Sequence, residues 1–110
     1  MIKVAVTGNI GSGKTEFIKF ISKLGFCCIS SDAIISKLYN NFNVTVFVKS
    51  DTIKRKKRVL NRGVTEDYFK LMNNKQIKEN IKKNKSTFTV NNNGSILNLR
   101  LNIIKLLNKL

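Results

Sequence analysis

Eight consecutive residues, GNIGSGKT at positions 8–15, carry the most specific chemistry in the sequence. They match the spacing GxxxxGK[ST], in which glycines let the backbone wrap around phosphate oxygens and turn its N–H groups toward them. The Lys14 ammonium is placed to reach the β and γ phosphates of a nucleotide, and the Thr15 hydroxyl can complete the shell of a bridging Mg²⁺. The pattern predicts a site for Mg·ATP formed by Gly8, Asn9, Ile10, Gly11, Ser12, Gly13, Lys14 and Thr15.

Three charged side chains elsewhere could act on a phosphate group held by this loop. Asp32 follows an apolar segment at 26–30, where a carboxylate could take the proton of an attacking hydroxyl. The same residue could instead cap the next helix, and the local sequence leaves both interpretations open. Arg58 and Arg62 are four residues apart on one helix face, which suits closure over transferring phosphates, although a solvated helix surface would show the same spacing.

The elements that must position these groups alternate along the chain. Short apolar segments predict strands, and helical periodicity with start signals such as Ser50, Asp51 and Ser95 predicts helices between them. This alternation is typical of a parallel α/β sheet, and we expect a three-layer α/β/α fold with about four strands. The expected strands lie at about 2–7, 26–30, 44–48 and 87–90, and the expected helices at about 14–24, 32–41, 51–62, 65–85 and 95–110.

Apolar residues at helical spacing predict the buried faces of the first and last helices. Gly25 is expected to end the first of them, and Ser95 to begin the last. The predicted core residues are Phe17, Ile18, Phe20, Ile21 and Leu24 in the first helix, and Ile96, Leu99, Ile103, Leu106 and Leu110 in the last.

Length and composition restrict the function classes. The 110 residues suit a single domain, 1–110, and the absence of histidine excludes Ser-His or Cys-His nucleophiles and histidine-ligated metals. The cysteines are adjacent, at Cys27 and Cys28, which disfavours a mutual disulfide. Because the sequence has neither an apolar run long enough for a membrane span nor a signal-peptide pattern, we expect a soluble cytoplasmic protein.

The net charge of +15 does not by itself indicate a nucleic acid partner. Lysine outnumbers arginine 17 to 4, and lysine, asparagine and isoleucine are abundant throughout, as in proteins from AT-rich genomes. The densest basic run, 54–58, falls in a predicted helix without interleaved aromatic residues. We therefore expect small-molecule substrates rather than nucleic acid.

Several blocks of the sequence, in order, resemble the dephospho-CoA kinase family. VAVTGNIGSGKT is similar to the opening phosphate loop of that family, and LGFCCISSDAI to the segment that carries its second aspartate, at Asp32. VTVFVKSDTIKRKKRVLNRGVT resembles a strand and lid helix with arginines at Arg58 and Arg62, and Gln76 follows at the spacing of the family. STFTVNNNG resembles the turn beside the adenine ring, which assigns Asn92, Asn93 and Gly94 to nucleotide binding.

The resemblance implies a P-loop kinase-like phosphotransferase. Its reaction would be the ATP- and Mg²⁺-dependent phosphorylation of the ribose 3′-hydroxyl of dephospho-CoA, the last step of coenzyme A synthesis. Asp32 would orient and deprotonate the hydroxyl, while Lys14 and Arg62 would stabilise the transferring charge. Thr15 would bind the metal.

The sequence departs from the family between Tyr39 and Val44. Family members are longer there and carry a further strand and the helical part that holds dephospho-CoA. Without that strand, the segments at 2–7 and 26–30 should pair directly, which predicts the strand order 2-1-3-4. Two alternatives to a shortened kinase stay open, an ATP-binding remnant without acceptor activity and a polyanion-binding basic protein. The oligomeric state also stays open, since a small core is compatible with self-association.

Overall fold

The computed structural model describes residues 3–30, 44–75 and 86–109. The predicted helix at about 32–41, the second half of the helix predicted at 65–85, Asp32, Gln76 and Leu110 lie outside these ranges. The described strands are β1 (Lys3–Thr7), β2 (Cys27–Ser30), β3 (Val44–Lys49) and β4 (Phe88–Asn91). The described helices are α1 (Lys14–Lys23), α3 (Thr52–Asn61), α4 (Glu66–Lys75) and α6 (Ile96–Leu107).

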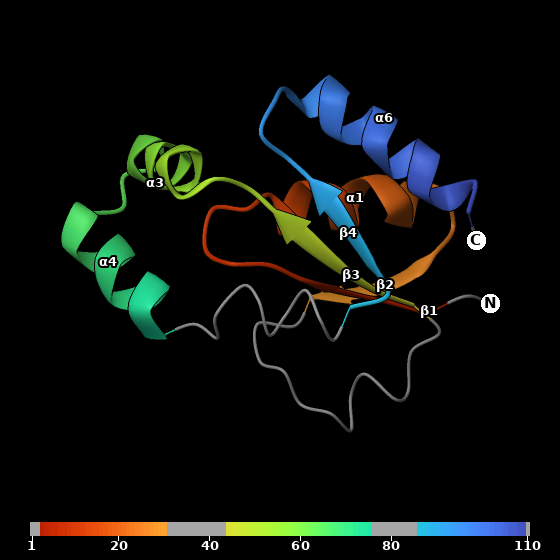
Figure 1. The fold of residues 1–110 in the computed structure, drawn as a ribbon, viewed down its shortest axis with the longest axis horizontal. Helices are drawn as coiled ribbons and strands as arrows, with labels where there is room; N and C mark the ends of the chain where they lie inside the picture. Colours follow the sequence, from red (N-terminus) through yellow and green to blue (C-terminus); the bar gives the residue numbers. More distant parts are fainter. Residues whose placement is uncertain (1–2, 31–43, 76–85, 110) are drawn as a thin grey trace.

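The four strands form one parallel sheet in the order β2-β1-β3-β4 (Figure 1). β1 pairs with both β2 and β3, so that Val4 lies beside Cys28 on one side and Val44 on the other. The predicted strand order and the predicted α/β fold class, a three-layer sheet flanked by helices, are confirmed. The first and last residues of each observed strand differ from the predicted ones by at most one position.

The core lies on both faces of β1 and β3. Consecutive residues of a strand point to opposite faces, yet Val44 to Val48 are all buried. Helices α1 and α6 pack side by side over one face (Figure 1), where Phe17 and Ile103 are fully buried against the valines of the sheet. Burial on both faces explains why the strands read as continuous apolar runs.

The predicted core faces of α1 and α6 are partly wrong at their ends. Leu24 is 50% exposed because it is the C-cap residue of α1, after which Gly25 turns the chain with a φ of 93°. Ile96 is 54% exposed because it is the first residue of α6 and lines an open cleft instead of the core. The central positions Phe17, Ile21, Leu99, Ile103 and Leu106 are buried as predicted.

Helices α3 and α4 lie beyond the carboxyl ends of the strands (Figure 1). An ion pair of 2.5 Å between Lys56 and Glu66 joins the two helices at the surface. The Lys56 ammonium lowers the pKa of the Glu66 carboxyl. Within the described ranges, every helix is too short or too polar to cross a membrane.

The N-terminus of α6 offers a test of local stability. The Ser95 hydroxyl accepts a hydrogen bond of 3.2 Å from the Asn98 backbone N–H. Replacement Ser95→Ala leaves that N–H without its partner, and we expect the free energy of unfolding to fall by about 1 kcal/mol. Urea denaturation would measure this change. Ser95→Asp, which keeps an acceptor oxygen, should retain the stability, and equal midpoints for all three proteins would contradict the capping role.

Candidate active site

The glycine-rich loop at 8–15, which the sequence predicts to bind phosphate and which we call the phosphate loop, connects β1 to α1 at the carboxyl edge of the sheet. Gly11 and Gly13 have φ angles of 78° and 101°, which side chains with a Cβ rarely adopt. A hydrogen bond of 3.0 Å from the Ser12 N–H to the Asn9 carbonyl closes the turn. Gly13 is the N-cap residue of α1 and has no side chain to cap it, so that the loop runs directly into the first turn of the helix.

Three loops meet at this edge because β1, β3 and β4 are parallel and end together. Ser50 follows β3, and its hydroxyl oxygen lies 3.0 Å from the Ser12 carbonyl oxygen and 2.5 Å from that of Asn92. Its single proton can serve one of these carbonyls at a time. Asn92 follows β4 and donates from its side-chain nitrogen to the Ser12 carbonyl at 2.9 Å. The shape of the phosphate loop is therefore set by the two neighbouring loops.

The Arg58 guanidinium joins the same group of carbonyls from α3. Its Nη1 donates to the Gly11 carbonyl at 3.0 Å and to the Ser50 hydroxyl at 2.9 Å, and Nη2 donates to the Asn92 carbonyl at 2.6 Å. Burial lowers the pKa of Arg58, and the nearby Arg62 cation lowers it further, but an arginine remains protonated in such surroundings. Arg58 thus holds the loop backbone in this structure, a different contact from the predicted closure over phosphates.

The orientation of these carbonyls fixes the orientation of the amides that follow them. In a trans peptide the C=O of one residue and the N–H of the next point in opposite directions. Because Asn92 and Ser50 hold the Ser12 carbonyl, the Gly13 N–H is directed away from them. The protein thereby binds the carbonyl side of the loop and leaves amides on the other side.

A cleft of about 760 Å³ opens beside the loop, a size that suits a small-molecule ligand. Lys14 and Thr15 line it from the start of α1, and Arg62 lines it from the C-cap of α3. In the described part of the chain, no hydrogen bond or ion pair of the Arg62 side chain is found. The predicted site residues that line this cleft are Ile10, Gly11, Ser12, Gly13, Lys14, Thr15, Arg58, Arg62, Asn92 and Gly94.

The remaining predicted site residues of the described ranges do not line the cleft. Gly8 and Asn9 are buried at the base of the loop. The Asn93 side chain accepts a hydrogen bond of 2.8 Å from the Asp51 N–H, and its carbonyl accepts one from the Lys54 ammonium. Asn93 therefore holds the turn after β4 to the start of α3.

The sequence pattern missed several residues of the site. Arg55 is 2% exposed and donates a hydrogen bond to the Ile10 carbonyl of the loop. Ser50, which we expected only as a helix start, contacts Ser12, Asn92 and Arg58 through its hydroxyl. Glu16 and Met72 also line the cleft. A helix with cations at 54–58 gives no signal for which one turns inward, because arginine and lysine are equally polar in a periodicity analysis.

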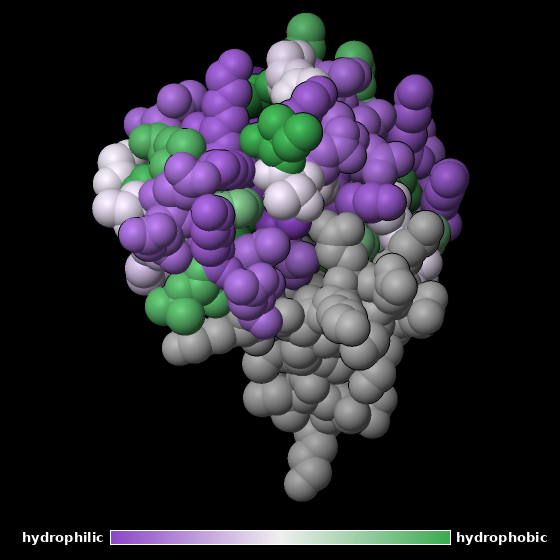
Figure 2. Space-filling view, turned by 60° about the vertical axis from the view of Figure 1, so that its left-hand side comes forward, coloured by the Kyte–Doolittle hydropathy of each residue, from purple (hydrophilic) through white to green (hydrophobic). Residues whose placement is uncertain are grey.

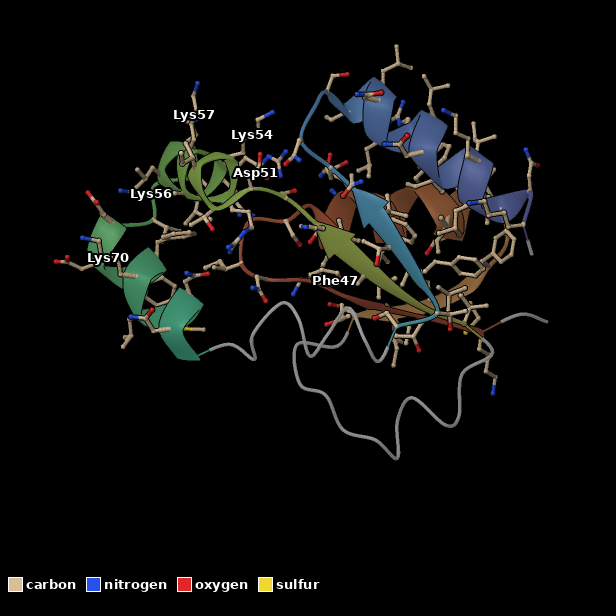
Figure 3. The ribbon with its side chains drawn as sticks, in the orientation of Figure 1. Phe47, Asp51, Lys54, Lys56, Lys57 and Lys70 are labelled. Carbon is tan, nitrogen blue, oxygen red and sulfur yellow. The ribbon has the colours of Figure 1, made fainter. Side chains whose placement is uncertain are left out.

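The lysines of the basic run in α3 differ in whether they have a partner within the protein. Lys54 bonds to Asn93 and Lys56 to Glu66, whereas Lys57 points away from the fold (Figure 3). Figure 2, which turns α3 and α4 toward the viewer, shows hydrophilic side chains over most of the described surface and separate hydrophobic groups. Partners within the protein thus account for part of the positive charge of this helix.

Comparisons with known proteins show the fold alone. No protein-family model and no curated protein sequence matches the chain. The crystal structure of TT1252 from Thermus thermophilus matches with a TM-score of 0.74 and 16% identity, over 99% of this chain and 97% of that one. An uncharacterized protein from Eubacterium ventriosum matches with a TM-score of 0.72 and 14% identity, over the full length of both chains. At 16% and 14% identity, these matches support the α/β architecture of this chain and assign no activity to it.

The carbonyl contacts of Arg58 predict a stability effect. Replacement Arg58→Ala removes the donor to the Gly11 carbonyl and one of the two donors near the Asn92 carbonyl, and we expect the free energy of unfolding to fall by about 2 kcal/mol. Arg58→Lys should not restore it, because one ammonium cannot reproduce the planar fork of a guanidinium. Urea denaturation would measure both effects.

Lys57→Ala is the matched control, since Lys57 is the exposed neighbour of Arg58 on the same helix. Its midpoint should equal that of the wild type. An Arg58→Ala midpoint equal to that of Lys57→Ala would show that the guanidinium contributes nothing to the loop.

Proposed function

We propose that the protein transfers the γ-phosphoryl group of Mg·ATP to the ribose 3′-hydroxyl of dephospho-CoA and so forms CoA. The observation that carries this proposal is the convergence of Lys14, Thr15 and Arg62 with the loop amides on one cleft at the carboxyl edge of the sheet. Cations and N–H groups at this place are the donors that phosphoryl transfer requires. The choice of acceptor rests on the resemblance of the sequence blocks to the dephospho-CoA kinase family.

The residues of the cleft fit the two ends of a nucleotide. The polar end has the loop amides and the Lys14 ammonium for the phosphates, and the Thr15 hydroxyl is the oxygen ligand available to a Mg²⁺ ion between them. When bound, this ion would neutralise charge on the β and γ phosphates. Gly94, Ile96 and Leu99 also line the cleft, and their apolar atoms suit a base.

Arg58, in α3, and Arg62, at its C-cap, would have different roles in the reaction. Arg58 is occupied by backbone carbonyls and shapes the loop, whereas Arg62 is exposed at the end of α3 and can follow the phosphoryl group. In the transfer, the 3′-oxygen bonds to the γ-phosphorus while the bond to the β–γ bridging oxygen breaks. The hydroxyl proton would pass to Asp32, a role that rests on the resemblance because Asp32 lies outside the described residues.

A cytoplasmic location fits the proposal. ATP and a thiol-containing substrate are both found in a reducing compartment, and Cys27 and Cys28 are free thiols. Burial raises the pKa of the Cys28 thiol to about 11, which keeps it protonated and unreactive near neutral pH.

The test is CoA formation by the purified chain with Mg·ATP and dephospho-CoA. Lys14→Ala removes a donor to the transferring phosphates, and we expect the turnover to fall by about a hundredfold or more. Lys23→Ala, a change of an exposed lysine on the same helix, should keep the wild-type rate.

The outcomes separate the alternatives. Equal rates for Lys14→Ala and the wild type would overturn the assignment of the loop. ATP binding by calorimetry without CoA formation would favour an ATP-binding remnant. RNA binding that falls steeply with salt and ignores ATP would instead indicate a polyanion-binding protein.

A further inference from the structure

Arg55 is a fully buried cation that connects α3 to both the phosphate loop and α4. Its Nε donates to the Ser50 carbonyl at 3.1 Å, and Nη2 donates to the Thr52 hydroxyl at 3.1 Å. Its Nη1 has two hydrogens, which reach the Ile10 carbonyl at 3.3 Å and the Asn73 side-chain oxygen at 2.9 Å. One nitrogen atom therefore links the loop to α4.

The loop side of this link controls the peptide between Ile10 and Gly11. Arg55 binds the Ile10 carbonyl, and the Arg55 backbone oxygen lies so close to Gly11 that a Cβ there would approach it to 2.5 Å. The Gly11 N–H points opposite to the Ile10 C=O, because the peptide is trans. Arg55 thereby directs one of the amides that the proposed function assigns to phosphate binding.

On α4, an oxygen acceptor and an aromatic ring both contact the Arg55 guanidinium. Asn73 must present its oxygen to Arg55, since a guanidinium has donors alone. The Phe69 ring, buried at 3% exposure on the same helix, lies 5.9 Å from the guanidinium carbon. Asn73 itself does not line the cleft, so an effect of this residue on a ligand would pass through a neighbour, and its hydrogen bond to Arg55 leads directly to the loop.

We propose that Asn73 is a positioning residue, which sets the phosphate affinity of the loop by holding Arg55 on the Ile10 carbonyl. This inference rests on the proposed binding of Mg·ATP to the loop. Without the Asn73 oxygen, one hydrogen of a buried cation loses its acceptor, and the guanidinium turns to find another. The Ile10–Gly11 peptide is then held less firmly, and its N–H is less well placed for a phosphate oxygen.

The same link predicts coupling in the other direction. A ligand that needs the Gly11 N–H in its present orientation favours the arrangement in which Arg55 and Asn73 are bonded. Thermodynamic linkage requires that phosphate binding then strengthens the docking of α4 on α3 by the same factor. Met72, the neighbour of Asn73, lines the cleft, so α4 would be held in place when the cleft is filled.

The test compares Asn73 with its exposed neighbour Asn74 in the full chain. Isothermal titration calorimetry with Mg·ATP should give a dissociation constant about tenfold higher for Asn73→Leu, the size of one lost hydrogen bond to a charged group. Asn74→Leu should bind as the wild type does. Asn73→Asp should restore binding to within about twofold, because a carboxylate accepts from a guanidinium even better than an amide does.

A spectroscopic measurement separates positioning from general damage. In ¹H–¹⁵N spectra without ligand, the Gly11 amide resonance should move in Asn73→Leu and stay in place in Asn74→Leu and Asn73→Asp. If Asn73→Leu does not fold, Asn73→Ala takes its place in both measurements, since it removes the acceptor without adding a larger apolar side chain.

Each result decides for or against the inference. Equal affinity of Asn73→Leu and Asn74→Leu, or equally weak binding by Asn73→Asp and Asn73→Leu, overturns it and leaves the proposed function standing. A wild-type chain that does not bind Mg·ATP overturns both. A chain that binds Mg·ATP without forming CoA overturns the transferase alone, and the Asn73 comparison still decides the positioning role.

Discussion

The phosphate loop needs partners for its own backbone carbonyls, and two guanidinium groups of α3 supply them. A glycine-rich turn has neither helix nor strand pairing to satisfy these groups, and a buried carbonyl without a partner is costly. Arg55 binds Ile10, and Arg58 binds Gly11 and approaches Ser12 at 3.4 Å. The loop therefore depends on α3 for these contacts, even though 36 residues separate Thr15 from Thr52.

The position of α3 follows in turn from the parallel sheet. Because β1, β3 and β4 all run in one direction, the residues after each strand reach the same edge. Ser50 and Asn92 are the first residues after β3 and β4, and both bond to the loop after β1. Short contacts between these three loops replace the rigidity that a helix or strand would give, and they leave the amide side of the phosphate loop open to a ligand.

The few arginines of this chain are concentrated near the candidate site. The protein has 17 lysines and 4 arginines, and three of the four arginines lie in or at the end of α3, facing the site. The fourth, Arg100, lies 5.6 Å from the Phe20 ring centre. A compact ammonium could satisfy one carbonyl at a time, whereas a planar fork satisfies several at fixed angles. The positive charges of the chain consequently have different roles: lysines such as Lys57 face solvent, whereas Arg55 and Arg58 bind backbone carbonyls.

The strand order followed from the family resemblance, whereas the sequence by itself determined the alternation of strands and helices and the place of the phosphate loop. These features depend on local signals, namely apolar runs, helix caps such as Ser95, and the obligatory glycines at Gly11 and Gly13. The tertiary structure alone decided that Arg58 would bind carbonyls and that Asn93 would turn from the cleft toward α3. It also decided that Arg55 would be buried. These outcomes depend on which carbonyls three distant loops bring within hydrogen-bond distance, and no pattern along a single helix records that.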